Sequence, residues 1–365
     1  VAAVLAPQGE KLLTMGEAHA GQTVALAGLS AKPGERIGAD CGLEVPETVP
    51  LMSVQVEPTA PLTQSALLAH LREMEEEDPL LSVRPEADGV SVGVMGAVQV
   101  EVLQGILAAR FGDVVRMCPP HVLYRETIAA PVVGIGHYEP LRHYAEVWLK
   151  LEPGAPGSGV SFAADCPPNS LEENWQRLIR SHVFERAHPG VLTGSPLCDV
   201  RIRLIAGRAH LKHTEGGDFR EATCRAIRNA LMQAENVLLE PVVHFELAMP
   251  NEALARVTGE LLRIGAQLDT SETDGGETML TGRCTAAMFW DYPTRFVAST
   301  RGHGRIASRF DRYEPCKNQD DMVRQIGYDP LADTLNPPGS VFCSHGAGFY
   351  VAWDHVREWA HCEVE

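Results

Sequence analysis

Polar and apolar residues alternate from Arg201 to Ile205, and from Asp218 to Gln233 apolar residues recur every three to four positions. The first pattern predicts a half-buried strand and the second an amphipathic helix. The residues between them are polar and include three glycines, so we expect a long loop or hairpin with regular structure on both sides. We also expect the Asp218 carboxylate to accept hydrogen bonds from the first turn of the helix.

Two other stretches share the order strand, helix, strand, strand, helix, strand, which is that of a ferredoxin-like domain. In the first, the helix ends in an acidic run, Glu73 to Asp78, which we interpret as a solvated helix end rather than a metal site. The elements of the first stretch are Met52–Val56, Leu62–Glu77, Leu81–Arg84, Val90–Val94, Gly96–Phe111 and Val114–Met117. Those of the second are Pro241–Leu247, Asn251–Arg263, the hairpin Gln267–Ser271 with Thr278–Gly282, Cys284–Ala298 and Arg305–Tyr313.

The segment between these stretches mixes strands and helices. Strands are predicted at 144–151 and 160–163, and Gly136 to His143 is predicted to be a polar, aromatic loop before them. Ser170 to Glu173 has the pattern of a capping box, and the helix after it runs to Val183. Trp175 and His182 on this helix are expected in the core or at an interface.

Both ends of the chain also contain short strand patterns. Ala6–Glu10, Gly21–Leu29 and Lys32–Glu35 are separated by turn residues, which is typical of a small barrel, and Pro46 and Pro50 mark its exit. Near the other end, Gly339–Cys343 and Phe349–Trp353 predict two strands, followed by a short helix with Trp359. We expect this last part to pack as a cap on the second ferredoxin-like domain.

The predicted fold class is therefore α+β and multidomain. It consists of a partial small β-barrel, two ferredoxin-like βαββαβ domains flanking an elongated α/β domain, and a C-terminal extension. The predicted boundaries are 1–46, 47–119, 120–239, 240–315 and 316–365.

Charge and composition narrow the function. With 48 acidic and 31 basic residues the net charge is -17, yet Arg201 to His213 contains four permanent cations, two histidines and no acid. Such a local reversal suggests a site for a polyanion, and the alternative is a solvated hairpin with exposed cations. No apolar run is long enough to span a bilayer, and the nine cysteines show no CxxC pair, so we expect a cytoplasmic protein with reduced thiols.

Catalytic and metal motifs are not found. No GxxxxGK[ST] loop, nucleophile elbow or HExxH occurs, so no catalytic residue is predicted. Five residues near the C-terminus are of ligand type, but their spacing is not that of a closed zinc site, and we expect no metal there. They are Cys316, Cys343, His345, His361 and Cys362.

Four short motifs in this order resemble the second half of elongation factor G and its relatives. They are Tyr124-Arg125-Glu126-Thr127, Leu238-Leu239-Glu240-Pro241, Ser299 to Gly304 and Phe310-Asp311-Arg312-Tyr313. Gly217-Asp218-Phe219-Arg220 and Glu240-Pro241 resemble the tetracycline-resistance ribosomal protection proteins. Those proteins have an aromatic, serine and proline-containing tip where this chain has His210 to Thr214.

The resemblance implies a ribosome-binding module whose fourth-domain tip reaches the small-subunit decoding centre and whose fifth domain faces the large-subunit factor-binding region. Ribosomal RNA would be the partner, and a monomer without membrane contact is implied. GTP and Mg²⁺ would belong to a preceding GTPase domain rather than to these residues. The alternative is a ribosome-independent protein-interaction scaffold with the same fold. The candidate RNA- or ribosome-binding residues are His137, Tyr138, Arg142, His143, Arg208, His210, Leu211, Lys212, His213, Thr214, Arg301, His303 and Arg305.

Overall fold

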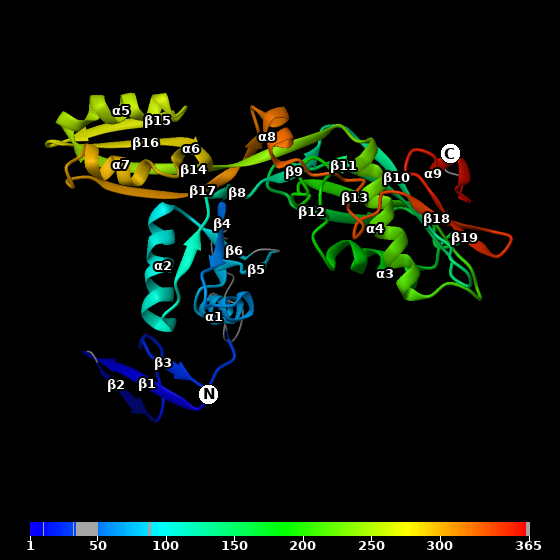
Figure 1. Ribbon diagram of the computed structural model, residues 1–365, viewed down its shortest axis with the longest axis horizontal. Coiled ribbons are helices and arrows are strands. Elements are labelled where there is room, and N and C mark those ends of the chain that lie inside the picture. Colours follow the sequence, from blue (N-terminus) through cyan, green and yellow to red (C-terminus); the bar gives the residue numbers. More distant parts are fainter. Residues whose placement is uncertain (10, 32, 34–49, 87–88, 363–365) are drawn as a thin grey trace. The chain divides into compact units, whose positions relative to one another are not determined.

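The computed structural model describes residues 1–9, 11–31, 33, 50–86 and 89–362. The chain divides into two compact units, Val1–Pro120 and His121–Glu365. Each unit is described below by itself (Figure 1).

The chain begins with a small antiparallel sheet in the order β2-β1-β3. Its strands are β1 (Ala3–Gln8), β2 (Lys11–Met15) and β3 (Ala25–Ala27). β2 was not predicted. Of the strand expected at 32–35 only Pro33 is described, and Pro46 also lies outside the described residues.

The rest of the first unit has ferredoxin-like topology. Its strands follow the order β5-β6-β4-β7 and all pairs are antiparallel. The elements are β4 (Met52–Pro58), α1 (Gln64–Glu77), β5 (Arg84–Pro85), β6 (Val90–Val94), α2 (Ala97–Phe111) and β7 (Val115–Met117). The strand predicted at 81–84 was wrong in position, because a 3-10 turn at Pro79–Leu81 precedes the two-residue β5.

The acidic end of α1 forms surface ion pairs. Arg110 of α2 binds Glu73 and Glu77 at 2.6 Å each, and Glu75 accepts a hydrogen bond from the backbone N–H of Val83 at 2.7 Å. These carboxylates therefore face solvent and the neighbouring helix. Exposed pairs of this kind contribute little to stability, because solvent and salt screen them.

The second unit is built around a six-stranded sheet in the order β12-β13-β11-β10-β18-β19. After the short strand β8 (His121–Val122) come β10 (Val132–Tyr138), β11 (Ala145–Pro153), β12 (Val160–Ala164), α3 (Glu173–Phe184), β13 (Val200–Ala209) and α4 (Gly216–Gln233). α3 and α4 cover one face of this sheet (Figure 1). Leu149 of β11, Ile202 of β13 and Phe219 of α4 are fully buried there. Trp148 points to the opposite face, where it packs near α9 (Val356–Trp359).

Two glycines of β10 let α4 lie close against the sheet. A Cβ atom at Gly134 would overlap the carbonyl oxygen of Ala226, and one at Gly136 would overlap that of Ala222. Any larger residue would therefore push the helix away. Both glycines fell in or beside a stretch predicted as loop, and that prediction was wrong from Gly136 to Tyr138.

The helix starts also differ from prediction. α3 begins at Glu173, its N-cap is Glu172, and no side-chain capping bond is formed there, so the capping box predicted at Ser170 was wrong. α4 begins at Gly216, and Asp218 accepts a hydrogen bond from the backbone N–H of Glu215 at 2.8 Å. Asp218 therefore caps the helix from its third position.

A second ferredoxin-like sheet follows, in the antiparallel order β15-β16-β14-β17. Its elements are β14 (Asn236–Pro250), α5 (Leu254–Arg263), β15 (Gln267–Asp274), β16 (Glu277–Thr285), α6 (Ala286–Phe289), α7 (Tyr292–Ser299) and β17 (Arg305–Pro315). The single helix predicted at 284–298 was wrong. Cys284 belongs to β16, and the helix is interrupted before Pro293, which lacks a backbone N–H and fits a first helical turn. β9 (Arg125–Ile128) pairs with the first residues of β14.

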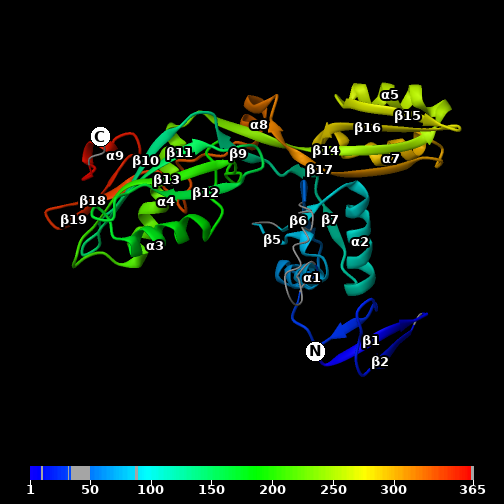
Figure 2. The same ribbon diagram turned by 180° about the vertical axis from the view of Figure 1, so that it is seen from behind.

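The C-terminal segment joins the six-stranded sheet, so the predicted cap on the second ferredoxin-like domain was wrong. After α8 (Gln319–Ile326), the hairpin β18 (Ser340–Ser344) and β19 (Ala347–Val351) extends the sheet beside β10, as both ribbon views show (Figures 1 and 2). Register explains the attachment: Tyr138 pairs with Val341, and the backbone N–H of His137 donates to Ser340 Oγ at 3.0 Å.

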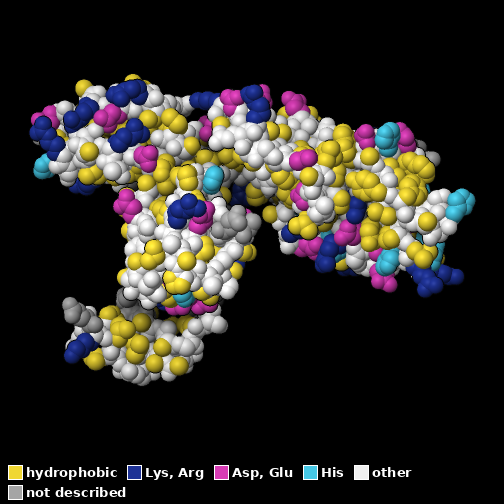
Figure 3. Space-filling model, in the orientation of Figure 1, with side chains coloured by type: hydrophobic (Ala, Val, Ile, Leu, Met, Phe, Trp, Pro, Cys, Tyr) yellow, Lys and Arg dark blue, Asp and Glu magenta, His cyan; other side chains and the backbone are white. Residues whose placement is uncertain are grey.

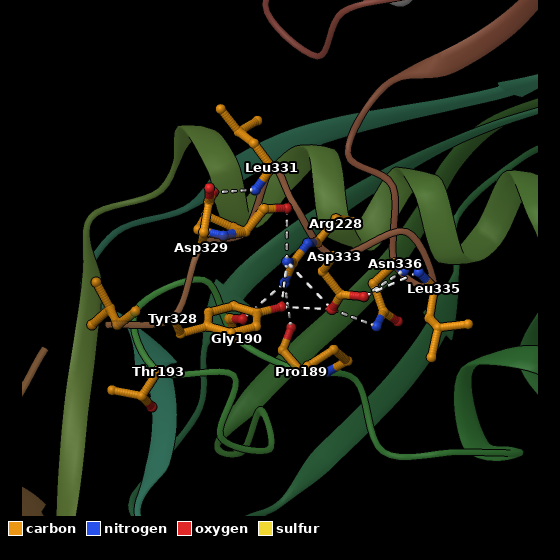
Figure 4. Close-up of polar contacts among 12 residues, drawn as sticks. Pro189, Gly190, Thr193, Arg228, Tyr328, Asp329, Leu331, Asp333, Leu335 and Asn336 are labelled. Carbon is orange, nitrogen blue, oxygen red and sulfur yellow. Dashed lines mark hydrogen bonds and ion pairs between the residues drawn. The ribbon is translucent and has the colours of Figure 1, made fainter. Parts of the chain in front are cut away.

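Arg228 of α4 binds an earlier part of the same C-terminal segment, around Tyr328 and Asp333 (Figure 4). Its guanidinium is buried and donates to the Gly190 carbonyl at 2.8 Å and to the Tyr328 hydroxyl at 2.7 Å. Tyr328 in turn donates to Asp333 at 2.7 Å. Burial alone would raise the pKa of Asp333, but hydrogen bonds from Tyr328 and Asn336 and the charge of Arg228 hold it below its usual value.

Candidate nucleic-acid interface

Two loops lie side by side at one end of the six-stranded sheet. One joins β10 to β11 over 139–144, and the other joins β13 to α4 over 210–215. Ala145, the first residue of β11, pairs with Ala209, the last residue of β13, so the two loops leave the sheet at the same level. We call these two loops the tip.

Hydrogen bonds join the two loops. Thr214 Oγ1 donates to the Tyr144 carbonyl at 2.7 Å, and His143 Nδ1 lies 2.8 Å from Asp218 Oδ1 at the start of α4. Because Asp218 is buried and also caps its helix, it fixes both the helix start and the first loop. The predicted residues His143 and Thr214 thus hold the tip together.

The second loop is a tight turn with its own internal bonds. The backbone N–H of His210 donates to Thr214 Oγ1 at 2.6 Å, and the N–H groups of His213 and Thr214 both donate to the His210 carbonyl at 3.1 Å. The rings of His210 and His213 stack at 4.5 Å. Between them Leu211 is fully exposed, as is expected of a side chain at the apex of a turn.

The cations are divided between the two ends of β13. Arg208 and Lys212 are exposed at the tip, and Arg142 is exposed in the first loop with a positive φ of 68°. Arg201 is roughly 23 Å from Arg208 along an extended strand. Arg203, also at that far end, is paired with Asp165. Lysine, arginine and histidine side chains gather at the tip end of the sheet in the space-filling view (Figure 3).

Two predicted tip residues lie in the strand instead. His137 is fully buried, stacks on Phe342 at 4.1 Å and places Nδ1 2.7 Å from Glu146 Oε2. Burial would raise the pKa of Glu146, but hydrogen bonds from His137, from two backbone N–H groups and from Trp148 lower it to about 2. Tyr138 is half-buried beneath the guanidinium of Arg225, and burial raises its pKa. Neither ring is presented to solvent as a loop residue would be.

The structure adds a third turn to the same end of the sheet. Because β18 runs parallel to β10, its last residues lie where β10 also ends. The turn contains His345, which is exposed and has a positive φ of 50°. This neighbour was not predicted, because the hairpin was expected to pack on the second ferredoxin-like domain.

A hollow lies beside the second loop. It has a volume of about 280 Å³ and is lined by Asn169, Ser170, Trp175, His210 and Thr214, among others. Trp175 also packs on Phe219 with ring centres 5.1 Å apart, which confirms its predicted core position. His182 is likewise buried, as predicted.

The predicted site residues of the second ferredoxin-like domain lie at the turn between α7 and β17. Arg301 and His303 are exposed and line a shallow hollow of about 370 Å³ together with Arg256. Arg301 has a φ of 51°. Arg305 instead pairs with Glu277 at 2.9 Å on the surface. This surface therefore presents several cations, of which Arg305 is already neutralised by Glu277.

The fold and the tip together define a class: a multidomain factor in which an α/β domain with a cationic loop end is followed by a ferredoxin-like domain. Residues 120–235 match the family model "Elongation factor G, domain IV", and residues 237–323 match "Elongation factor G C-terminus". The two models together match more than half of the chain, which therefore contains domain IV and the C-terminal domain of the elongation factor G family. We refer to these regions as domain IV and the C-terminal domain.

A solved structure supports the fold over a longer stretch. The crystal structure of ttk003000868 from Thermus thermophilus matches 89% of this chain with a TM-score of 0.64 and 23% sequence identity. This chain covers 51% of that protein, so it spans about half of the relative's length. Among the helices that the structure describes, none is long and apolar enough to cross a membrane.

Proposed function

We propose that this chain is the ribosome-binding C-terminal module of an elongation factor G-like translational GTPase. The observation that carries the proposal is the braced tip of domain IV, where Arg208 and Lys212 are exposed at the end of a rigid sheet within an acidic chain. Cations at such a position neutralise phosphates, and the exposed histidine rings of the loop can stack on unpaired bases. Ribosomal RNA at the decoding centre is the partner that this chemistry fits.

The finer assignments follow from the same resemblance. We assign the chain to the tetracycline-resistance ribosomal protection branch and place it in the cytoplasm as a monomer. GTP and Mg²⁺ act in a GTPase domain outside these residues, so this chain supplies no catalytic group. Arg301 and His303 of the C-terminal domain face the large-subunit factor-binding region.

The test is co-sedimentation with ribosomes over a range of salt concentrations. The double variant Arg208→Ala, Lys212→Ala removes two phosphate contacts, so the slope of log K against log salt should fall by roughly 1.4 to 1.8. The matched control is Arg201→Ala, Arg324→Ala, which removes the same charge at exposed positions of the far strand end and of α8. The control should keep the original slope.

Three outcomes are informative. An equal slope in the tip variant and the control would refute the role of the tip. Absence of binding by the unaltered protein would favour the ribosome-independent scaffold. With tetracycline-loaded ribosomes, release of the drug on binding would support the resistance branch, and retained drug would assign the protein to another step of translation.

A further inference from the structure

Three side chains of metal-ligand type converge from three segments of the second unit. His137 comes from β10, Glu146 from β11 and His361 from the end of the C-terminal segment. One ligand atom of each lies within 4.8 Å of the others. His137 and Glu146 are fully buried and His361 is exposed, so the cluster is closed on the sheet side and open to solvent on one side.

The outer hydrogen bonds hold all three side chains in ligand orientation. His137 directs Nδ1 at Glu146, while its Nε2 lies 3.1 Å from Glu139 Oε2. His361 Nδ1 lies 3.0 Å from the Tyr144 hydroxyl, which leaves Nε2 for a ligand bond. Metal-binding histidines usually have such a carboxylate or hydroxyl partner on the second ring nitrogen.

The second oxygen of Glu146 is fixed as well. Oε1 accepts hydrogen bonds from Trp148 Nε1 at 2.8 Å and from the backbone N–H of Cys362 at 2.7 Å. Oε2 therefore faces His137 in a defined direction. Its other close donor is the backbone N–H of His361 at 2.8 Å.

Negative charge collects in this cluster, because Glu146 and Glu139 bring two carboxylates. Arg208 lies nearby, and its exposed guanidinium donates to the His361 carbonyl at 3.4 Å. Hydrogen bonds from Trp148 and two backbone N–H groups already stabilise the buried Glu146 carboxylate. A divalent cation bound between Glu146 Oε2 and the imidazoles would add a counter-charge at this carboxylate.

We propose that His137, Glu146 and His361 bind one divalent transition-metal ion, and Zn²⁺ is the ion tested because two imidazoles, a carboxylate and a water form one of its tetrahedral ligand sets. At Zn²⁺ bond lengths of about 2.1 Å, tetrahedral ligand atoms lie roughly 3.4 Å apart. His137 Nδ1 and Glu146 Oε2 are 2.7 Å apart, so the ion replaces the hydrogen between them and separates them by somewhat over half an ångström. The open side leaves the fourth position to water. The ion ties the C-terminal segment to the sheet that holds the tip.

This site shares only His361 with the five residues of ligand type considered from sequence. Those residues all belong to the last fifty positions, whereas His137 and Glu146 lie more than 200 positions before His361. Spacing along the chain therefore gives no indication of the cluster.

The experiment uses the full chain, stripped with a chelator, dialysed and titrated with Zn²⁺ against a fluorescent competitor. We expect one Zn²⁺ per chain, protons released on binding, and the visible absorption of tetrahedral Co²⁺ when Co²⁺ is added instead. His361→Ala should abolish stoichiometric binding. His345→Ala, an exposed histidine of the same segment, is the control and should bind as the unaltered chain does.

A second variant separates ligation from folding. Glu139→Gln keeps the volume and a hydrogen-bonding oxygen but removes the negative charge beside His137 Nε2, so it should weaken Zn²⁺ binding by about 10- to 100-fold. The proposal is overturned if the unaltered chain binds no stoichiometric Zn²⁺, or if His361→Ala binds it with unchanged affinity. It is also overturned if nitrogen NMR shows His137 protonated on both ring nitrogens with Zn²⁺ present.

Discussion

Replacing Arg228 by alanine should release the C-terminal segment from α4 while domain IV stays folded. The guanidinium is 3% exposed and is the point where the loop carbonyls of Pro189 and Gly190 meet the Tyr328 and Asp333 side chains. No other cation that the structure describes lies in this set of contacts (Figure 4). The variant therefore leaves Asp333 without its counter-charge.

The magnitude follows from these contacts. Hydrogen bonds to a charged group contribute about 1.5–3 kcal/mol each, but contacts that share one side chain do not add. Removal of one partner from a buried pair costs about 3–5 kcal/mol, and Asp333 is partly solvated at 16% exposure, so the lower end applies. About 3 kcal/mol corresponds to roughly a 150-fold change in the opening equilibrium of the segment.

Native-state hydrogen exchange measures that equilibrium. The backbone N–H groups of Leu335 and Asn336 donate to Asp333 Oδ1 at 3.1 and 3.2 Å, so they report directly on the segment. Their exchange should accelerate by about two orders of magnitude in Arg228→Ala. Arg220→Ala is the control, because Arg220 is on the same helix but exposed and bound only to Glu185 among the described residues. Unchanged exchange at Leu335 and Asn336 would refute the role of Arg228.

Two further predictions concern packing and pH. Gly136→Ala should lower the free energy of unfolding by about 1–3 kcal/mol or more, because the new methyl group would overlap the Ala222 carbonyl. The control Gly105→Ala, an exposed helix position with open space around it, should be neutral or stabilising by up to about 1 kcal/mol, and urea denaturation compares them. Because the folded pKa of Asp333 is lowered, its contribution is complete above the unfolded pKa of about 3.8 and is lost as the pH falls through the folded value. Protection of the Leu335 amide should decline in that range, and Asp333→Asn should remove the pH dependence.

Local signals made several elements predictable from the sequence. The strand Val90–Val94 and the helix after it were placed within one residue, because a glycine and an apolar run mark both ends. The hairpin of β15 and β16 was also predicted, although its strands extend beyond the predicted 267–271 and 278–282, to Asp274 and over Glu277–Thr285. Its turn has Gly275 and Gly276 at φ values of 60° and 129°, where glycine is strongly preferred.

The strand β10 could not be predicted because both of its faces are covered. Gly134 and Gly136 face α4, while Ile135 and His137 on the opposite face pack against Val356 of α9 and His361, more than 200 positions later. A strand covered on both faces loses the alternation that identifies half-buried strands. Its polar residues then resemble a loop. The missing information was which distant segment covers the second face, namely α9 and the residues after it.

The same long separation along the sequence explains why the position of the C-terminal hairpin and part of the candidate site were not predicted. Periodicity identified the strands at 340–344 and 347–351 but could not say which sheet they join. The tip loop at 210–215 was predicted, because the strand before it and the helix after it are adjacent to it in sequence. His345, in contrast, reaches the tip only through the β18 and β10 pairing.

The late position of β18 has a consequence for synthesis of the protein. Domain IV has all its other strands and both of its helices once residue 233 has been made, but β10 remains an uncovered sheet edge until the hairpin that ends at Val351 follows. At 5–20 residues per second this takes roughly 6 to 24 s. An uncovered strand can pair with other chains, so the nascent protein passes through a period in which it is open to aggregation and to chaperones. Slower translation across the C-terminal domain would lengthen that period.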